Sequence, residues 1–285
     1  MTLESTGSIA RVREVTDRAR AAGRRVGFVP TMGYLHAGHA SLVAAARAHD
    51  DLVVVSIFVN PLQFAPGEDL DAYPRDLERD LAVCAEEGAD LVFAPPVEEM
   101  YPRPPSTTVT VSGVSEPLEG RSRPTHFAGV ATVVAKLFAI VGPCRAYFGE
   151  KDWQQLRVVQ TMAADLSLPV EVVGCPIVRE PDGLALSSRN VYLSDEERAQ
   201  APVLHRALRH GAELVAGGET DPGRVEAAMA AVIGEAPLAT LDYVAAVQAD
   251  SLTADGPLHG EVRLLGAVRF GRARLIDNVG VTAPA

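Results

Sequence analysis

Two imidazole side chains stand three residues apart in this sequence, His36 and His39, directly after a glycine-containing turn. Residues 26–29 (Val-Gly-Phe-Val) predict a buried strand before the turn, because they are apolar and partly β-branched. Gly38 marks the predicted start of a helix, where unpaired N–H groups and the helix dipole favour an anion. The two histidines therefore lie where imidazoles suit phosphate.

Two other interpretations of this histidine pair stay open. A His-x-x-His pair is a fragment of many zinc sites, but Cys84, Cys144 and Cys175 are scattered and complete no cluster of ligand spacing. The histidines also fit helix-capping or surface positions. The pair alone favours phosphate over zinc, but it does not decide between phosphate binding and capping.

The composition limits the class of protein. A chain of 285 residues exceeds one ordinary domain, so we expect one large and one small domain. A hydrophobic content of 47% is enough for a sizeable core. The net charge of −11 argues against a protein that holds nucleic acid on a broad basic surface. An anionic ligand must therefore be held by local positive charge.

The sequence also indicates a cellular compartment. Residues 1–25 hold no apolar core of signal-peptide length, and the apolar run 127–141 is short and interrupted by Lys136. Three unclustered cysteines fit a reducing environment. We expect a soluble, cytoplasmic protein with no nucleic-acid and no membrane partner.

Strand and helix patterns alternate over the first two thirds of the chain. Helical spacing of apolar residues predicts a helix over 9–22, and the apolar run 52–59 predicts a central parallel strand covered on both faces. Further strands are predicted at 91–94, 107–111 (an edge strand), 145–148 and 170–173, and a further helix at 127–141. This order predicts an α/β fold with a Rossmann-like parallel sheet domain over residues 1–177.

The remaining residues, 178–285, predict a smaller α+β domain. The capping box 194–197 should begin one long helix that runs past Leu214. A second helix over 224–233 and strands near 241–247, 263–270 and 273–277 follow. We find no separate catalytic cluster there, and we expect this domain to act as a lid over a nucleotide.

Polar residues follow the predicted strands at the edge where open α/β sheets bind ligands. Asn60 and Gln63 come after strand 52–59, where they can read hydroxyls and a carboxylate. After strand 145–148, Lys151 can neutralise phosphates and Asp152 can accept from ribose hydroxyls, while Gln155 can face the substrate beside Gln63. Taken singly, each also fits an ordinary turn, cap or salt bridge.

Two further segments carry cations. Arg123 lies on a loop before a predicted helix, where a guanidinium can reach a carboxylate or phosphate, although a surface arginine is an equal alternative. Ser187, Ser188 and Arg189 resemble the mobile phosphate-gripping loop of class I synthetases. A Ser-Ser-Arg tripeptide by itself is a weak signal.

Four sequence motifs, in this order along the chain, resemble those of the pantothenate synthetase family. This family belongs to the nucleotidyltransferase superfamily, which carries a His-x-Gly-His signature. The blocks begin at Pro30 (Pro-Thr-Met-Gly-x-Leu-His-x-Gly-His), Phe58 (Phe-Val-Asn-Pro-x-Gln-Phe), Arg123 (Arg-Pro-Thr-His-Phe-x-Gly-Val) and Phe148 (Phe-Gly-Glu-Lys-Asp-x-Gln-Gln). The sequence departs from the family at Trp153, where tyrosine is usual, and at Leu186, where methionine is common.

The resemblance implies ATP-dependent condensation of (R)-pantoate with β-alanine through a pantoyl adenylate, with release of pyrophosphate and AMP. It implies ATP as a substrate, Mg²⁺ and a homodimer. Asp80 or Glu78 can touch the magnesium ion, but the spacing singles out neither. Nothing in the sequence indicates a dedicated base for the β-alanine amine.

The resemblance also implies roles for individual residues. His36, His39, Lys151 and Arg189 are the implied catalytic residues, and the histidines donate to phosphate oxygens as charge moves to the leaving pyrophosphate. Asn60, Gln63, Arg123 and Gln155 are implied to bind pantoate or β-alanine. The residues implied to contact ATP are Pro30, Met32, Gly33, Tyr34, Leu35, His36, Ala37, Gly38, His39, Gly149, Glu150, Lys151, Asp152, Val178, Leu186, Ser187, Ser188 and Arg189.

Two other functions stay open at this point. One is a related nucleotidyltransferase that stops after it transfers a nucleotide to a phosphate-bearing acceptor. The other is a regulator that binds a nucleotide without catalysis. Dependence of the chemistry on pantoate separates the three.

Overall fold

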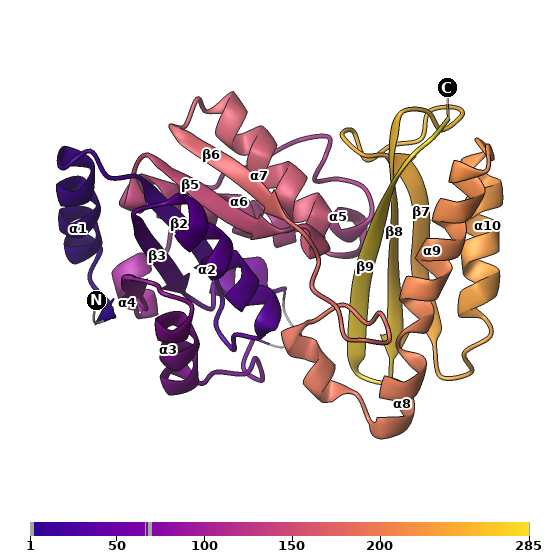
Figure 1. Ribbon diagram of the computed structural model, residues 1–285, viewed down its shortest axis with the longest axis horizontal. Helices are drawn as coiled ribbons and strands as arrows, with labels where there is room; N and C mark the ends of the chain where they lie inside the picture. The colour runs from indigo at the N-terminus through magenta and orange to yellow at the C-terminus, as the bar shows by residue number, and fades with distance from the viewer. Residues whose placement is uncertain (1–2, 66, 68–69, 285) are drawn as a thin grey trace. The chain divides into compact units, whose positions relative to one another are not determined.

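The computed structural model describes residues 3–65, 67 and 70–284 and divides into two compact units (Figure 1). The first unit comprises Met1–Ser115, Glu119–Glu150 and Gln155–Pro176. The second unit comprises Glu116–Leu118, Lys151–Gln154 and Ile177–Ala285. Two short segments thus belong to the second unit although longer stretches of the first unit flank them in the sequence.

The first unit is built on a parallel sheet of six strands in the order β1-β4-β3-β2-β5-β6. Strand β3 lies between β4 and β2, and its residues are buried up to the last position, as the almost unbroken apolar run predicts. The strands are β1 (Glu4–Thr6), β2 (Val26–Thr31), β3 (Leu52–Ile57), β4 (Leu91–Phe93), β5 (Cys144–Gly149) and β6 (Val170–Cys175). The predicted parallel α/β sheet is confirmed.

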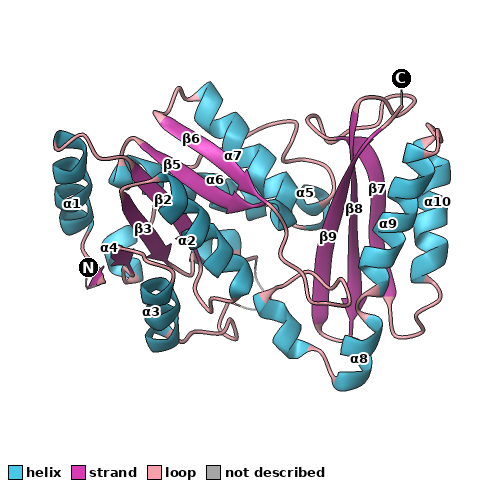
Figure 2. Ribbon diagram, in the orientation of Figure 1, coloured by secondary structure: helices cyan, strands magenta, loops and turns pink. Residues whose placement is uncertain are grey.

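Helices alternate with these strands (Figure 2). On one face of the sheet Val29 packs in a buried cluster with Val43 of α2, and on the other the ring of Phe28 meets Phe138 of α6 edge to face at 6.5 Å. The helices are α1 (Ile9–Ala21), α2 (Ala37–His49), α3 (Leu77–Glu86), α4 (Val97–Met100), α5 (Glu119–Ser122), α6 (His126–Val141) and α7 (Trp153–Asp165), with short 3₁₀ turns η1 (Pro61–Gln63) and η2 (Glu150–Asp152). Alternate strand residues therefore point to opposite covered faces.

Helix α6 lies unusually close to η1, and this contact sets the position of residues 60–63. A Cβ added at Gly129 would stand 2.3 Å from the carbonyl oxygen of Leu62, which is closer than real Cβ atoms come. The Gly129 carbonyl in turn accepts from Asn60 Nδ2 at 3.2 Å. Glycine is required at this position because a backbone atom occupies the space.

The second unit holds an antiparallel sheet in the order β7-β8-β9, with α9 and α10 side by side along it (Figure 1). Leu204 and Leu208 of α9, Met229 of α10 and Leu264 of β8 belong to its buried core. The elements are η3 (Ser188–Tyr192), α8 (Asp195–Gln200), α9 (Val203–Ala216), α10 (Pro222–Ile233), β7 (Thr240–Gln248), β8 (Glu261–Phe270) and β9 (Ala273–Thr282). The predicted smaller α+β arrangement is confirmed.

Three local predictions are wrong or incomplete. Residues 107–111 are not a strand, because the Val109 N–H donates to Thr132 Oγ1 of α6 at 2.9 Å instead of to a neighbouring strand. The single long helix predicted after 194–197 is two helices, α8 and α9, separated at Pro202, which has no N–H to continue the ladder. Strand β1 was not predicted, because Glu-Ser-Thr has no apolar pattern.

The close contact of α6 with η1 gives a stability prediction. Gly129→Ala should lower the free energy of unfolding by about 1–3 kcal/mol, because either the helix or residues 62–63 must shift. Urea unfolding measures this change. Gly256→Ala is the matched control, since a Cβ there meets nothing within 4 Å. Unchanged stability of Gly129→Ala would contradict the packing described.

Candidate active site

The turn between β2 and α2 contains two consecutive residues with positive φ angles, Gly33 and Tyr34. Gly33 has a φ of +86°, in the region that favours glycine, and a Cβ there would meet both Asp80 Oδ2 and Ile57 Cγ2 at 2.9 Å. Tyr34 follows with a φ of +52°. Two consecutive left-handed residues make a sharp turn that an ordinary sequence would not hold.

The side chain of Asp80, in α3, holds this turn by binding the backbone N–H groups of the turn. The side chain is 1% exposed, and its carboxylate accepts from the N–H groups of Tyr34 at 2.8 Å and Leu35 at 2.7 Å. Burial raises the pKa of Asp80, and the two backbone N–H groups oppose that shift by favouring the charged form. Asp80 therefore anchors the turn.

The two histidines cap the helix they precede. His36 is the N-cap of α2, and its Nδ1 accepts from the Gly38 N–H at 3.1 Å. His39 Nδ1 accepts from the His36 N–H at 3.3 Å, and the two ring centroids are 4.1 Å apart. A ring nitrogen that accepts a hydrogen bond carries no proton, so each neutral imidazole bears its hydrogen on Nε2. Capping and phosphate binding are therefore compatible: Nδ1 serves the helix and Nε2–H is a donor.

Asn60 follows the end of β3 and is buried, with 1% of its surface exposed. Its side chain forms hydrogen bonds with other residues of the protein. Its Oδ1 accepts from the Tyr101 hydroxyl at 2.9 Å and from the Leu62 N–H at 3.3 Å. Its Nδ2 donates to Gln63 Oε1 at 3.2 Å. The arrangement makes Asn60 a support that orients the Gln63 amide.

Gln63 joins three of the predicted segments. Its Nε2 donates to the sulfur of Met32 at 2.9 Å, and its backbone carbonyl accepts from Arg123 Nη2 at 3.3 Å and His126 Nδ1 at 3.0 Å. The structure thus brings Met32, Gln63 and Arg123 together in the first unit. Tyr101 and His126 were not predicted as site residues; His126 falls inside a recognised block, but Tyr101 lies in a proline-rich connection with no periodic signal.

The segment after β5 contributes to both units. A Cβ at Gly149 would meet nothing within 4 Å, so open space lies beside this strand end. Lys151 Nζ lies 3.7 Å from Asp152 Oδ1, so the two neighbouring side chains form an ion pair. Gln155, the third residue of α7, is half-buried. Among the described residues no hydrogen bond joins Gln155 to Gln63, so their convergence stays a prediction.

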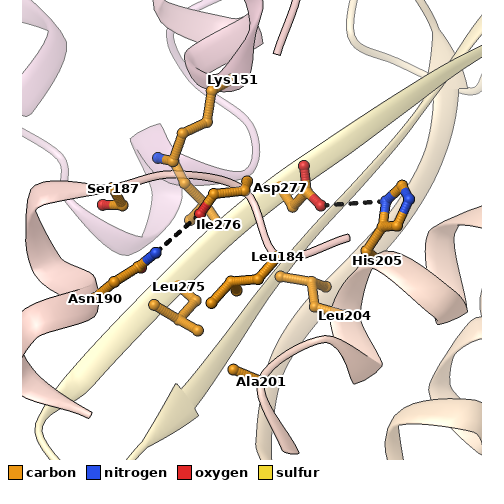
Figure 3. A pocket seen from close by; sticks show the side chains of 11 residues that line it. Lys151, Leu184, Ser187, Asn190, Ala201, Leu204, His205, Leu275, Ile276 and Asp277 are labelled. Atoms are coloured by element: carbon orange, nitrogen blue, oxygen red, sulfur yellow. Dashed lines mark hydrogen bonds and ion pairs between the residues drawn. The ribbon is translucent and has the colours of Figure 1, made fainter. Parts of the chain in front are cut away.

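In the second unit, Lys151 and Ser187 line one pocket together with Asp277 (Figure 3). Ser187 Oγ accepts from the Arg189 N–H at 3.3 Å and so caps the η3 turn that holds Ser188 and Arg189. Apolar residues complete part of the lining: Leu184, Leu204 and Leu275.

The residues predicted to contact ATP divide between the units. The first unit holds Pro30, Met32, Gly33, Tyr34, Leu35, His36, Ala37, Gly38, His39, Gly149 and Glu150. The second unit holds Lys151, Asp152, Val178, Leu186, Ser187, Ser188 and Arg189. The Leu186 N–H donates to the Val178 carbonyl at 3.0 Å, which ties the two backbone segments together.

Two kinds of feature are absent from the described part of the chain. No group of three His, Cys, Asp or Glu residues there is placed to hold a metal ion. None of the helices there combines the length and apolar character needed to cross a membrane.

The fold and the site define a Rossmann-like α/β protein with a histidine-capped turn and a cluster of hydrogen-bonded polar side chains at the ends of its parallel strands. The family model described as pantoate–β-alanine ligase matches residues 4–280. The chain therefore belongs to the pantoate–β-alanine ligase family.

Curated and solved relatives agree with this family. A pantothenate synthetase from Roseiflexus sp. is 56% identical over 271 residues, covering 95% of this chain and 96% of its own length. The crystal structure of pantothenate synthetase from Thermus thermophilus matches at a TM-score of 0.93 and 52% identity, covering 98% of this chain and 100% of that one. Pantoate–β-alanine ligase from Francisella tularensis, solved with β-γ ATP and β-alanine, matches at a TM-score of 0.80 and 32% identity, covering 98% of this chain and 97% of that one.

The anchoring role of Asp80 gives a prediction. Asp80→Ala should lower the free energy of unfolding by about 1–3 kcal/mol, because the N–H groups of Tyr34 and Leu35 lose their buried acceptor. Denaturant unfolding measures the loss. Glu78→Ala, an exposed carboxylate on the same helix, should have a much smaller effect. Equal stability of the two variants would show that Asp80 does not hold the turn.

Proposed function

We propose that this chain condenses (R)-pantoate with β-alanine to form pantothenate, using ATP and passing through a pantoyl adenylate. The pantoate carboxylate attacks the α-phosphate, pyrophosphate leaves, and the amine of β-alanine then displaces AMP. One observation supports this proposal most strongly: hydrogen bonds join Gln63 to Met32 and Arg123 beside the histidine-capped turn. The chain also matches the family over residues 4–280. The Francisella tularensis relative bound to β-γ ATP and β-alanine supports the substrate classes.

The first step must overcome charge repulsion, because a carboxylate approaches a polyanion. The chain has a net charge of −11, so the positive charge has to be local. Lys151 and Arg189 supply it, with the Ser187 and Ser188 hydroxyls as further donors. Nε2–H of His36 and His39 donates to phosphate oxygens as charge moves to the leaving pyrophosphate. Because these donors are already in place, they stabilise that charge without rearranging during the reaction.

Pantoate would be read by the polar cluster of the first unit. The Gln63 amide, fixed by Asn60, binds the small acid together with Gln155, and the Arg123 guanidinium is suited to a carboxylate. In the second step β-alanine attacks as the free amine. Solvent or the departing adenylate takes its proton, since we assign no protein base.

Several broader features belong to the same proposal. The chain would act as a nucleotide- and pantoate-binding domain over 1–177 and a lid domain over 178–285, in a cytoplasmic homodimer. Mg²⁺ would enter with ATP, reducing the charge of the phosphates. The three cysteines, free in the structure, are consistent with a reducing compartment.

One assay separates this function from its alternatives. Labelled pyrophosphate should exchange into ATP without β-alanine only when pantoate is present, and AMP should accumulate once β-alanine is added. Exchange that ignores pantoate would favour a nucleotidyltransferase with another acceptor. Intact ATP binding without any exchange would favour a non-catalytic regulator.

The two amides give a specificity prediction. Gln63→Ala and Gln155→Ala should each raise KM for pantoate about tenfold, the loss expected for one hydrogen bond, with a much smaller change in KM for ATP. Steady-state kinetics of the exchange reaction measures both constants. Gln160→Ala is the control for Gln155, because on the same helix its Oε1 accepts from Arg157. Wild-type pantoate KM in either variant would refute that assignment.

His39 gives a prediction that separates the two steps. His39→Ala should slow adenylate formation by about 10²–10³ in rate, the usual cost of one preorganised donor. Reaction of chemically made pantoyl adenylate with β-alanine should suffer far less, because pyrophosphate has already gone. His49→Ala, at the exposed far end of α2, is the control. Equal impairment of both half-reactions would contradict the role of His39.

A further inference from the structure

Strand β9 carries two buried polar residues at adjacent positions, Asp277 and Asn278. They are 5% and 1% exposed. Adjacent side chains of a strand point to opposite faces, so the pair can hold two different chain segments. Both segments that they contact carry residues assigned above to ATP phosphates.

Asn278 holds the turn that carries Lys151. Its Nδ2 donates to the Lys151 carbonyl at 2.9 Å. The same turn is fixed through Trp153, whose Nε1 donates to the Ala249 carbonyl at 3.0 Å and whose ring centroid lies 3.3 Å from the Arg263 guanidinium carbon. These contacts lie within the second unit, which explains why Lys151 belongs to it.

Asp277 holds the segment that leads to Ser187 and Arg189. Its carboxylate accepts two hydrogen bonds from the Arg179 guanidinium, at 2.6 and 2.9 Å. Arg179 pairs with Ala185 in an antiparallel bridge, so fixing Arg179 fixes the start of the serine-rich segment. Burial acts to raise the pKa of Asp277, but its contacts with His205 and Arg179 lower it overall, so the pair stays charged.

The two anchors are also joined to each other. Arg179 Nη2 donates to the Asn278 carbonyl at 3.2 Å, and the Asn278 N–H donates to Asp277 Oδ1 at 2.7 Å. Lys151, Ser187 and Asp277 line the same pocket (Figure 3). One dipeptide therefore connects both phosphate-binding segments of the second unit.

We propose that Asp277 and Asn278 are positioning residues that fix the spacing between Lys151 and the Ser187–Arg189 segment. The two sets of donors then meet the phosphates as one preassembled group, and less ordering is required when ATP binds. This inference rests on the proposed function, which assigns both segments to ATP.

The first test separates ATP binding from pantoate binding. Asn278→Ala and the equally sized Asn278→Asp both remove the Nδ2–H donor, and each should raise KM for ATP about tenfold in pantoate-dependent pyrophosphate exchange. KM for pantoate should stay unchanged. Arg274→Gln is the control, because it breaks the Arg274–Asp242 ion pair between β9 and β7. An equal rise of both KM values in the Asn278 variants would overturn the proposal.

A second readout does not depend on activity. Trp153 is the one tryptophan of the sequence, so its fluorescence reports on the Lys151 turn. Acrylamide should quench it more strongly in Asn278→Ala than in wild type or Arg274→Gln. Unchanged quenching would overturn the proposal. If Asn278→Ala does not fold, Asn278→Ser, which keeps a shorter donor, should show smaller changes in the same direction.

A double-mutant cycle tests whether Asn278 acts through Lys151. Adding Asn278→Ala to Lys151→Ala should raise KM for ATP no further, whereas an independent rise of about tenfold would overturn the proposal. A wild-type KM for ATP in Lys151→Ala would instead refute the role of Lys151 in the proposed function. An impaired Lys151→Ala beside a normal Asn278→Ala would leave that function standing and defeat the positioning role alone.

Discussion

The site depends on the carboxylate of Asp80, which holds the backbone of the turn between β2 and α2. Without that acceptor, the N–H groups of Tyr34 and Leu35 would lose their shared hydrogen-bond partner, and that of Leu35 is buried. Gly33 is required next to it because the carboxylate occupies the space of a Cβ. The held turn leads directly into His36, the N-cap of α2, so the position of the donors proposed for the phosphates depends on this buried contact.

The positive charges and hydrogen-bond donors proposed for ATP are also held in place by a few contacts. An acidic chain that binds ATP needs its cations and donors placed in advance, because mobile ones cost entropy at each binding event. On the proposed function, neutral imidazoles and helix N–H groups of the first unit serve as donors, and the helix cap leaves the imidazole hydrogen on Nε2. In the second unit Lys151 is held through backbone and ring contacts, including the Asn278 bond to its carbonyl. On the proposed function, the first unit therefore supplies rigid neutral donors to the phosphates and the second unit supplies anchored cations.

Much of the fold could be predicted from the sequence, because β3 and its neighbours are largely apolar runs and the helices show clear periodicity. What failed depended on tertiary contacts. The partner of the Val109 N–H is a threonine hydroxyl on α6, which no local pattern reveals. The break at Pro202 was readable from the sequence alone, since proline has no N–H to continue a helix.

The candidate site shows the same division. The histidines, Asn60 and Gln63 were predicted because they follow strand ends in recognisable motifs, whereas the supporting roles of Asp80 and Tyr101 were not. Asp80 looks like any carboxylate on an amphipathic helix until its burial is seen. Tyr101 reaches Asn60 from a segment 41 residues away. Such residues bear no chemistry of their own, so their type and spacing carry no signal.

The central claim is that the helix cap fixes His36 and His39 as neutral Nε2–H donors. Two-bond ¹H–¹⁵N correlation spectra of the ¹⁵N-labelled protein, assigned with His36→Gln and His39→Gln, report the tautomer of each ring directly. The account predicts that at neutral pH both rings carry hydrogen on Nε2 and none on Nδ1. A hydrogen on Nδ1 of either ring, as the other tautomer or as imidazolium, would contradict it.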